Sequence, residues 1–305
     1  MNDRTPGVKI VTPAGHRSGF VAIVGRPNVG KSTLLNRILG QKVAIVTPKP
    51  QTTRSRILGI KTVDTAQIVF VDTPGMHRPR SLINRRMVQI AEHAAGEADL
   101  ILWVVDATDG VTPADRGIAS QLSGTKRPLC VVLNKIDRVQ RSRLLPILAD
   151  IERVLPDRHV VPVSATSGDN LAELVAQVVR MLPEGPPYYD SETLTDQTER
   201  VLAQEVIREQ VLLQTRDEVP YSVAVTIDRF EDRNELSVIS ATMHVERASQ
   251  KGILIGVRGA RIKAIGTAAR HELEEVLARR VHLELFVRVQ EEWTSREDLL
   301  REFGL

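Results

Sequence analysis

A glycine-rich octapeptide near the start of the 305-residue chain has the residue types and spacing of a phosphate-binding loop. Its sequence, Gly25-Arg-Pro-Asn-Val-Gly-Lys-Ser32, matches the pattern G-x-x-x-x-G-K-[ST]. The glycines let backbone N–H groups face phosphate oxygens, and the helix predicted to follow adds positive potential. Lys31 would contact the β- and γ-phosphates, and Ser32 would coordinate Mg²⁺. The predicted phosphate site consists of Gly25, Arg26, Pro27, Asn28, Val29, Gly30, Lys31, Ser32 and Thr33.

The tetrapeptide Asp72-Thr-Pro-Gly75 follows the apolar run Gln67–Val71 and suits a metal- and phosphate-sensing loop. An aspartate at a strand end can hold Mg²⁺ through a water molecule, and the Gly75 N–H can then contact the γ-phosphate. The predicted nucleotide site therefore also includes Asp72, Thr73, Pro74 and Gly75.

Asn134-Lys-Ile-Asp137, which follows the apolar run Leu129–Leu133, indicates that the base is guanine. The Asp137 carboxylate can accept both N–H groups of guanine's N1/N2 edge, and adenine lacks that pair. Asn134 would tie this loop to the phosphate loop, and the stem of Lys135 would cover the base.

Ser164-Ala165 follows the run Val160–Val163 and would present a backbone N–H to guanine O6. Each short motif alone is weak evidence, but four in this order, each after a predicted strand, are strong evidence. Together they resemble a translation-factor-type GTPase, in which five ordered motifs bind GTP and Mg²⁺. GTP and GDP are the expected nucleotides.

The fifth motif of such a GTPase is a switch threonine between the first helix and Asp72. Thr47, Thr52 and Thr53 are candidates, and we favour Thr53 because Thr-Arg occurs at this point in related ribosome-assembly GTPases. Its hydroxyl would order the loop when γ-phosphate and Mg²⁺ are bound and release it after hydrolysis. An N-cap or solvent-exposed loop threonine is the alternative. The predicted metal ligands are Ser32, Thr53 and Asp72.

The hydrolytic machinery has a gap at Met76. Ras-like enzymes place a water-orienting glutamine after the Asp-x-x-Gly motif, and a methionine cannot orient water. His77 is adjacent, but a catalytic role is a weak hypothesis, so we expect slow intrinsic hydrolysis. The Asn28 side-chain oxygen lies where similar GTPases bind K⁺ beside the phosphates, and this suggests stimulation by K⁺; a plain turn residue is the alternative. The predicted catalytic residues are Lys31, Thr53, Asn28 and Gly75.

Alternating strands and helices must position these motifs. Short apolar runs alternate with helical patterns, which indicates an α/β P-loop domain with a mostly parallel sheet covered on both faces. The polar segment Thr47–Arg56 is predicted to be a loop. We predict strands at Phe20–Val24, Gln67–Val71, Leu100–Val105, Leu129–Leu133 and Val160–Val163, and helices at Lys31–Leu39, Ile83–Ala95, Pro113–Leu122, Arg143–Val154 and Leu171–Met181.

Composition divides the chain further. Leu182-Pro-Glu-Gly-Pro-Pro-Tyr-Tyr189 has the composition of a linker, and the strand–helix rhythm changes after it. The boundaries that we predict are a flexible tail at 1–17, the nucleotide domain at 18–183, a linker at 184–197 and a small α+β domain at 198–305. The last has the order α-β-β-α-loop-α-β, with a helix at Asp196–Gln214, a hairpin of Tyr221–Phe230 and Glu235–Glu246, a helix at Ala260–Ala278 and a strand at Val281–Val289.

A second glycine loop, Gly256-Val-Arg-Gly259, lies between two predicted helices of the small domain. Residues 184–305 carry a net charge of −7, from 16 Lys and Arg and 23 Asp and Glu, yet 247–263 hold five basic residues and no acidic ones. Such a loop lets the backbone of single-stranded RNA approach closely, while basic side chains contact phosphates and isoleucines support bases. A helix–helix turn with a solvated basic face is the alternative. The predicted RNA-binding residues are Lys251, Ile253, Ile255, Gly256, Val257, Arg258, Gly259, Arg261 and Lys263.

The small domain resembles a KH module of the type II arrangement. KH loops often have the sequence I-G-K-G-G or I-G-x-K-G, whereas here Val257 and Arg258 stand between the glycines. A GTPase followed by a KH unit resembles the Era family of ribosome-assembly GTPases from about Phe20 to Leu305. The resemblance includes Gln51-Thr-Thr-Arg54, Asp72-Thr-Pro-Gly-Met-His77, Val219-Pro-Tyr221, Glu246-Arg-Ala-Ser-Gln-Lys251 and Glu292-Trp293.

The Era resemblance implies a GTP hydrolase that binds the 3′ region of small-subunit 16S ribosomal RNA during 30S assembly. Its nucleotide state would switch binding to the RNA or ribosome. We expect a monomer that acts in the cytoplasm.

Two rival functions are weighed, and the first arises because tRNA-modification GTPases resemble the first domain but carry different partner domains. A tRNA-modification GTPase would often use a reactive cysteine, but the lone Cys130 lies in a predicted core strand. A membrane-surface module is the other rival, because residues 18–183 carry a net charge of +8 and would be attracted to anionic lipid at the inner face of the cell membrane. We find no membrane span, signal peptide or clear amphipathic anchor.

Overall fold

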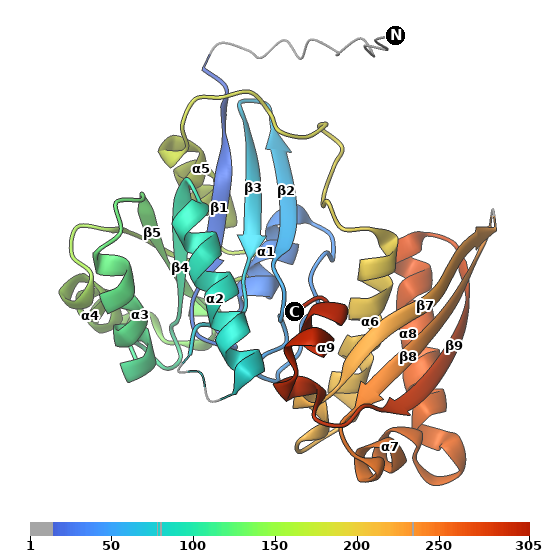
Figure 1. Ribbon diagram of the computed structural model, residues 1–305. Coiled ribbons are helices and arrows are strands. Elements are labelled where there is room, and N and C mark those ends of the chain that lie inside the picture. The colour runs from blue at the N-terminus through green and yellow to red at the C-terminus, as the bar shows by residue number, and fades with distance from the viewer. Residues whose placement is uncertain (1–14, 78, 80, 234) are drawn as a thin grey trace.

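The structure is a computed structural model that describes residues 15–77, 79, 81–233 and 235–305 (Figure 1). Most of the tail predicted at 1–17 therefore lies outside the described residues. Arg17, however, already opens the first strand, which begins earlier than the apolar run suggests.

A six-stranded sheet forms the centre of the N-terminal domain. All neighbouring strands are parallel except the edge pair β2 and β3, which is antiparallel. The strands are β1 (Arg17–Val24), β2 (Ile57–Val63), β3 (Ala66–Asp72), β4 (Leu100–Asp106), β5 (Leu129–Asn134) and β6 (His159–Pro162), in the order β2-β3-β1-β4-β5-β6.

Five helices cover this sheet on both faces. Every residue of β3, β4 and β5 is buried, as parallel strands between two helical layers should be. Helices α1 and α5 pack into the core of one face, and α2, α3 and α4 pack into the core of the other. The predicted fold class is confirmed. The helices are α1 (Lys31–Leu39), α2 (Leu82–Glu97), α3 (Pro113–Ser123), α4 (Leu144–Val154) and α5 (Leu171–Met181).

The C-terminal domain has the predicted order α-β-β-α-α-β. Its strands form a separate sheet in the order β7-β8-β9, with β7 and β8 antiparallel and β8 and β9 parallel. Helices α6 and α8 pack on one face of this sheet (Figure 1). The elements are α6 (Glu199–Gln214), β7 (Ala224–Arg233), β8 (Leu236–Val245), α7 (Ala248–Ile255), α8 (Ala260–Leu277) and β9 (Arg280–Val289).

A short helix at the C-terminal end, α9 (Glu297–Glu302), was not predicted from the sequence. It lies between α2 and the C-terminal sheet (Figure 1). Trp293, Leu300 and Phe303 form one apolar cluster there with Ile83 and Met87 of α2. This cluster joins the cores of the two domains.

The segment 184–197 packs along the first sheet. The Gln67 side chain accepts hydrogen bonds from the backbone N–H groups of Tyr188 and Tyr189. The Ile60 N–H of β2 donates to the Leu194 carbonyl at 2.8 Å. The predicted linker is therefore held against the strands rather than detached from them.

Within the described part of the chain, we find no helix that combines the length and apolar character needed to span a membrane.

Candidate functional site

The phosphate loop connects β1 to α1, and steric contacts explain its glycines. Gly25 has φ +154°, and a Cβ there would lie 2.5 Å from the Val104 carbonyl oxygen. Gly30 has φ +97°, and its Cβ would lie 2.4 Å from the side-chain nitrogen of Asn134. No side chain fits at either position. Gly30 caps α1, so the free N–H groups of its first turn lie beside the loop.

Lys31 lies under this loop. Its ammonium group donates to the Gly25 and Arg26 carbonyl oxygens, both at 3.1 Å. Burial lowers the pKa of Lys31 to about 8, although the nearby Asp72 carboxylate raises it. Bound phosphates would favour the charged form of the lysine.

Three oxygen-bearing side chains meet next to Lys31. Ser32 Oγ donates to Asp72 Oδ2 at 2.6 Å, and Thr53 Oγ1 lies 3.0 Å from Ser32 Oγ and 3.3 Å from Asp72 Oδ2. Thr52 instead pairs its hydroxyl with Thr47 at 2.7 Å. The geometry therefore favours Thr53 over the other two candidate switch threonines.

These three side chains suit a hard cation such as Mg²⁺. Asp72 is fully buried, and its Oδ1 atom has no hydrogen-bond partner among the described residues. Burial raises the pKa of Asp72, against the opposing effects of Lys31 and the two hydroxyls. The described residues contain no group of three or more His, Cys, Asp and Glu that could hold a metal. Ser32, Thr53 and Asp72 would share Mg²⁺ with nucleotide phosphates.

The Asp72–Gly75 loop packs tightly against the phosphate loop. A Cβ on Gly75 would lie 2.7 Å from the Pro27 backbone nitrogen, and the Met76 N–H donates to the Gly25 carbonyl at 3.0 Å. The Met76 side chain is buried in the core. His77 Nδ1 lies 2.7 Å from the Gly75 carbonyl oxygen. Position 76 therefore supplies no group to orient water, as the sequence suggests.

Asn134 ties three loops together. Its side-chain nitrogen donates to the Val29 carbonyl at 2.8 Å, and its side-chain oxygen accepts the Ala165 N–H at 3.0 Å. This second contact differs from the sequence expectation, because the Ala165 N–H is engaged by Asn134 rather than free for guanine O6. Ser164 donates its own N–H to the Asp169 carbonyl at 3.1 Å. The neighbouring Thr166 lines the cavity instead.

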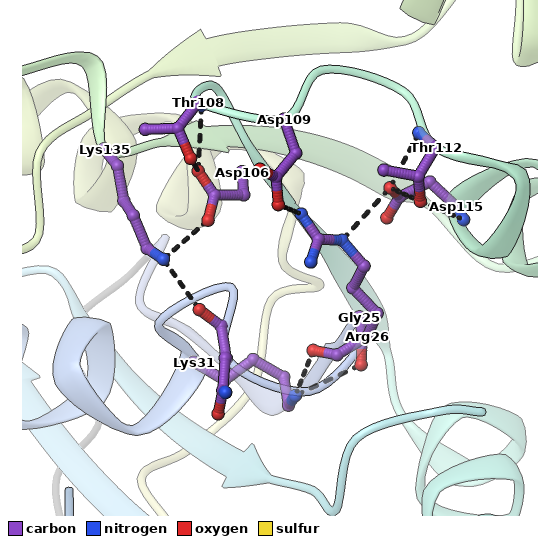
Figure 2. A network of polar contacts seen from close by, with 10 residues as sticks. Gly25, Arg26, Lys31, Asp106, Thr108, Asp109, Thr112, Asp115 and Lys135 are labelled. Atoms are coloured by element: carbon purple, nitrogen blue, oxygen red, sulfur yellow. Dashed lines mark hydrogen bonds and ion pairs between the residues drawn. The ribbon is translucent and has the colours of Figure 1, made fainter. Parts of the chain in front are cut away.

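Two charged bridges hold the phosphate loop from the side of β4 and α3 (Figure 2). Lys135 Nζ donates to the Asn28 carbonyl at 2.7 Å and to Asp106 at 2.5 Å. The Arg26 side chain pairs with Asp109 at 2.5 Å and with the buried Asp115 at 3.2 Å. Arg26 is thus directed toward α3, and only its backbone faces Lys31.

These loops surround a cavity of about 380 Å³. The predicted residues that line it are Pro27, Asn28, Gly30, Lys31, Ser32, Thr33, Thr53, Gly75, Asn134, Lys135 and Ala165. The other predicted nucleotide residues lie behind or beside the lining: Gly25, Arg26, Val29, Asp72, Thr73, Pro74, Asp137 and Ser164.

The sequence analysis missed part of this lining because its residues belong to no phosphate or base motif. Only their positions could have indicated them: some lie in the segment between α1 and Thr53, and two directly follow the motifs Asn134–Asp137 and Ser164-Ala165. They include Ile45, Val46, Pro48, Gln51, Arg138 and Thr166.

The second glycine loop has left-handed backbone at three positions. Gly256 has φ +71°, Arg258 φ +50° and Gly259 φ +78°. A Cβ on Gly256 would lie 2.8 Å from Arg261 Cβ, so the loop closes tightly onto α8. Gly259 caps α8 without a side-chain bond, which leaves N–H groups of the first turn available to an anion.

The remaining predicted RNA-binding residues surround this loop. Val257 is 83% exposed and Ile253 is 38% exposed, while Lys251 and Ile255 are half-buried. Arg258, Arg261 and Lys263 are exposed. The structure therefore brings exposed cations and an apolar surface together at one loop.

The loop between α1 and β2 contacts the C-terminal domain over much of its length. Lys42 pairs with Glu209 of α6 and Glu272 of α8. Lys49 donates to two carbonyl oxygens at the end of α6. The same loop carries Thr53, so its conformation is tied to both domains.

Arg54 makes the most buried of these contacts. Its guanidinium group donates to the carbonyl oxygens of Val223 at 2.6 Å and of Pro220 and Tyr221, both at 3.0 Å. It also lies 5.9 Å from the centre of the Trp293 ring. Burial lowers the pKa of Arg54 to about 9. The residue next to Thr53 is therefore anchored in the C-terminal domain.

Comparison with known proteins separates two matched regions. The family model described as "50S ribosome-binding GTPase" matches residues 20–135, and the model described as "KH domain" matches residues 218–294. GTPase Era of Geotalea daltonii is 49% identical over 295 residues, covering 96% of this chain and 99% of that protein. The chain belongs to the Era family of GTPases. GTPase Era of Geobacter metallireducens is 50% identical and covers 94% of this chain.

Two solved Era structures are similar along nearly the whole chain. One is Aquifex aeolicus Era, in a variant form bound to GDP·AlF4⁻, with TM-score 0.92, 43% identity and coverage of 94% of this chain and 99% of that one. The other is Era in complex with MgGDPNP and nucleotides 1506–1542 of 16S ribosomal RNA, with the same score and identity and coverage of 95% and 99%.

The comparisons confirm the predicted Era family, the GTPase fold followed by a KH domain, and the classification of the chain as a GTPase. The domain boundaries and the roles of individual Era site residues stay predictions.

Proposed function

We propose that this GTPase binds the 3′ region of 16S ribosomal RNA through its KH domain and acts in assembly of the 30S subunit. The observation that carries the proposal is the Gly256–Gly259 loop, with left-handed glycines and exposed cations in a domain matched as KH. A similar Era structure contains nucleotides 1506–1542 of 16S ribosomal RNA. We propose Mg²⁺ as the metal, with GTP and GDP as the nucleotides.

The residues of the nucleotide site have different roles in binding and hydrolysis of GTP. Lys31 and the phosphate-loop N–H groups hold the β- and γ-phosphates, and Asp137 selects guanine. Ser32, Thr53 and Asp72 hold the metal, which when bound neutralises charge on the phosphates. Gly75 senses the γ-phosphate through its N–H. No side chain at position 76 orients the attacking water, so unassisted hydrolysis is slow.

The loop that contains Thr53 would couple the bound nucleotide to the conformation of the RNA site. Thr53 lies 3.3 Å from Asp72, and its neighbour Arg54 is bonded to three carbonyl oxygens of the C-terminal domain. Release of Thr53 after hydrolysis would strain or break these contacts. We therefore propose that RNA affinity differs between the GTP and GDP forms.

RNA binding measured with a non-hydrolysable GTP analogue and with GDP tests this proposal. We expect wild-type protein to bind the 16S segment 1506–1542 and Gly256→Ala to lose most of that affinity, because its Cβ would contact Arg261. Gly252→Ala is the matched control, since its Cβ meets no atom within 4 Å. Absence of wild-type binding would contradict the RNA assignment, and equal affinities with both nucleotides would contradict the coupling.

We also propose that K⁺ stimulates hydrolysis at Asn28. Asn28 has φ +65° and donates its side-chain N–H to the Pro48 carbonyl at 3.0 Å, so the phosphate loop and the Thr53 loop meet there. The side-chain oxygen of Asn28 would bind the cation beside the phosphates. GTPase rates in KCl and NaCl test this, and equal rates would eliminate it.

We propose that the protein works as a monomer in the cytoplasm, where its RNA partner is found. Peripheral contact with the inner face of the membrane rests only on the net charge of residues 18–183. Flotation with anionic vesicles tests that contact, and sedimentation velocity tests the oligomeric state.

A further inference from the structure

The C-terminal sheet has an aromatic side chain on the face that α6 and α8 leave uncovered. Strand register places Thr226, Thr242 and Phe286 in one row across β7, β8 and β9. The inward neighbours of these residues, such as Ala241 and Leu285, belong to the core with α6 and α8. Phe286 is 53% exposed, so its ring is accessible to a ligand on this face.

Phe286 lies at a hollow of about 560 Å³ formed by the end of β9 and its neighbours. Arg288 and Val289 of β9 and Lys251 of α7 also line the hollow. The hollow therefore combines an aromatic ring with two cations from different elements.

The two cations are available to a ligand. Neither Lys251 nor Arg288 pairs with a carboxylate among the described residues. The one carboxylate of the hollow, Asp228, accepts a hydrogen bond from Thr242 Oγ1 at 2.7 Å and is therefore already engaged. An anionic group is the ligand that these charges favour.

Helix α7 links the hollow to the glycine loop, because Lys251 lies on this helix and the loop follows its end. Helix α7 packs against β9, and Lys251 precedes Gly256 by five residues, which is about 8 Å along a helix. The loop itself lacks aromatic residues on which bases could stack. A strand leaving the loop along α7 would meet Phe286 next.

We propose that this hollow is a second binding subsite for single-stranded RNA, occupied by a nucleotide of the strand that the Gly256–Gly259 loop holds. Phe286 stacks on the base, and Lys251 and Arg288 contact its phosphates. The proposal rests on the RNA-binding function proposed above. A protein partner fits less well, because Phe286 is surrounded by threonines and charged residues rather than by a wider apolar patch.

RNA length separates the two sites experimentally. The probes are 16S nucleotides 1506–1542 and versions shortened stepwise from either end, bound to full-length protein and measured by fluorescence anisotropy. For wild-type protein we expect RNA affinity to increase abruptly once the RNA is long enough to reach Phe286, and we call this increase the affinity step. Phe286→Ala should remove this step, a loss of roughly 5- to 100-fold, while leaving the affinity for the shorter RNA unchanged.

Matched variants identify the cause of the loss. Phe286→Trp should keep the step, because tryptophan also stacks. Leu236→Ala should keep it too, since Leu236 is an exposed apolar residue at the far end of the same sheet. The double variant with Lys251→Ala and Arg288→Ala should bind the longer RNA with a smaller dependence on salt concentration than wild-type protein. Phe286→Ala should leave this salt dependence unchanged. Circular dichroism checks that each variant is folded.

A direct readout comes from RNA carrying 5-iodouracil at successive positions, which crosslinks to aromatic side chains in contact with it. A crosslink at Phe286 is the expected result. If Phe286→Ala shows the same increase in affinity with RNA length as wild-type protein, the subsite proposal is wrong. That result is also the one expected if this surface binds a protein instead. The RNA-binding function itself would not be affected by it. Loss of all RNA binding by wild-type protein would instead remove the function on which the subsite rests.

Discussion

Asp137 is the residue on which nucleotide specificity depends most directly. Its side chain is 28% exposed, and among the described residues its one charged contact is a long one to Arg138, at 3.9 Å. The carboxylate therefore remains available to the N–H groups of guanine.

Replacement of Asp137 by asparagine should change the preferred base. One charged hydrogen bond is lost, so we expect GDP affinity to fall roughly 10- to 100-fold. The new amide N–H can donate to the 2-carbonyl of xanthine, so affinity for xanthosine diphosphate should rise. Competition binding measures the affinities for GDP and for xanthosine diphosphate. Asp150→Asn is the control, because Asp150 pairs with Arg153 on α4, away from the cavity. Unchanged base preference would contradict the assigned role.

Cys130 should be chemically inert in the folded protein. It is buried in β5, and burial raises the pKa of its thiol to about 12. Because the folded pKa is raised, burial of the neutral thiol stabilises the fold fully below the unfolded pKa, near 9, and this contribution is lost as pH rises toward 12.

Thiol labelling at pH 8 tests this. Native protein should react far more slowly than protein unfolded in guanidinium chloride. Rapid labelling of Cys130 in the native protein would contradict this prediction and would favour the rival class, the tRNA-modification GTPases that use a reactive cysteine.

At the scale of elements, the loop from Lys42 to Arg54 makes a series of hydrogen bonds and ion pairs with the C-terminal domain. These polar contacts go mostly to the C-terminal half of α6 and to the carbonyl oxygens that follow it. A polar interface can rearrange at lower cost than a fully apolar one. This suits a loop that must change conformation with the nucleotide.

Arg54→Ala should uncouple the two domains. It leaves three carbonyl oxygens without their donor, a cost of about 2 kcal/mol or more. We expect the difference in RNA affinity between GDP and a GTP analogue to shrink, and amide exchange in 219–223 to accelerate. Arg56→Ala is the matched control, since Arg56 is exposed two residues away. A preserved nucleotide effect would show that coupling uses another route.

Local patterns predicted the motif-bearing elements well. Buried strands such as β4 and β5 appear as continuous apolar runs, and α3 begins with a capping box at Thr112 and Asp115. Strand β2 was missed, because Gly59 interrupts its pattern and packs against Leu35 and Leu39.

Contacts between distant segments could not be predicted. Nothing local to Arg54 shows that its guanidinium group reaches carbonyl oxygens more than 160 residues away. The same holds for the engagement of the Ala165 N–H by Asn134.

At the scale of the whole molecule, the apolar cluster around α9 makes the domains share part of their stability. Leu300 is fully buried between α2 residues and Trp293. Ligand binding in one domain should therefore protect the other.

Hydrogen exchange with GDP and Mg²⁺ measures this linkage. In wild-type protein we expect slower exchange both around the phosphate loop and in 293–303. Leu300→Ala, which should cost about 2–5 kcal/mol, should confine the protection to the N-terminal domain. Leu213→Ala is the control, because Leu213 is 46% exposed on α6. If GDP and Mg²⁺ slow exchange in 293–303 equally in Leu300→Ala and Leu213→Ala, the two domains do not share stability through this cluster.

The segment 184–197 has a consequence beyond joining two domains. Strand β2 is an edge strand, and an open edge is a template on which another polypeptide can add in register. Here the Leu194 carbonyl accepts the Ile60 N–H, and the Thr195 hydroxyl donates to the Leu58 carbonyl at 2.7 Å. The connection between the domains thus occupies hydrogen-bonding groups of this edge and protects the protein against aggregation through its own sheet.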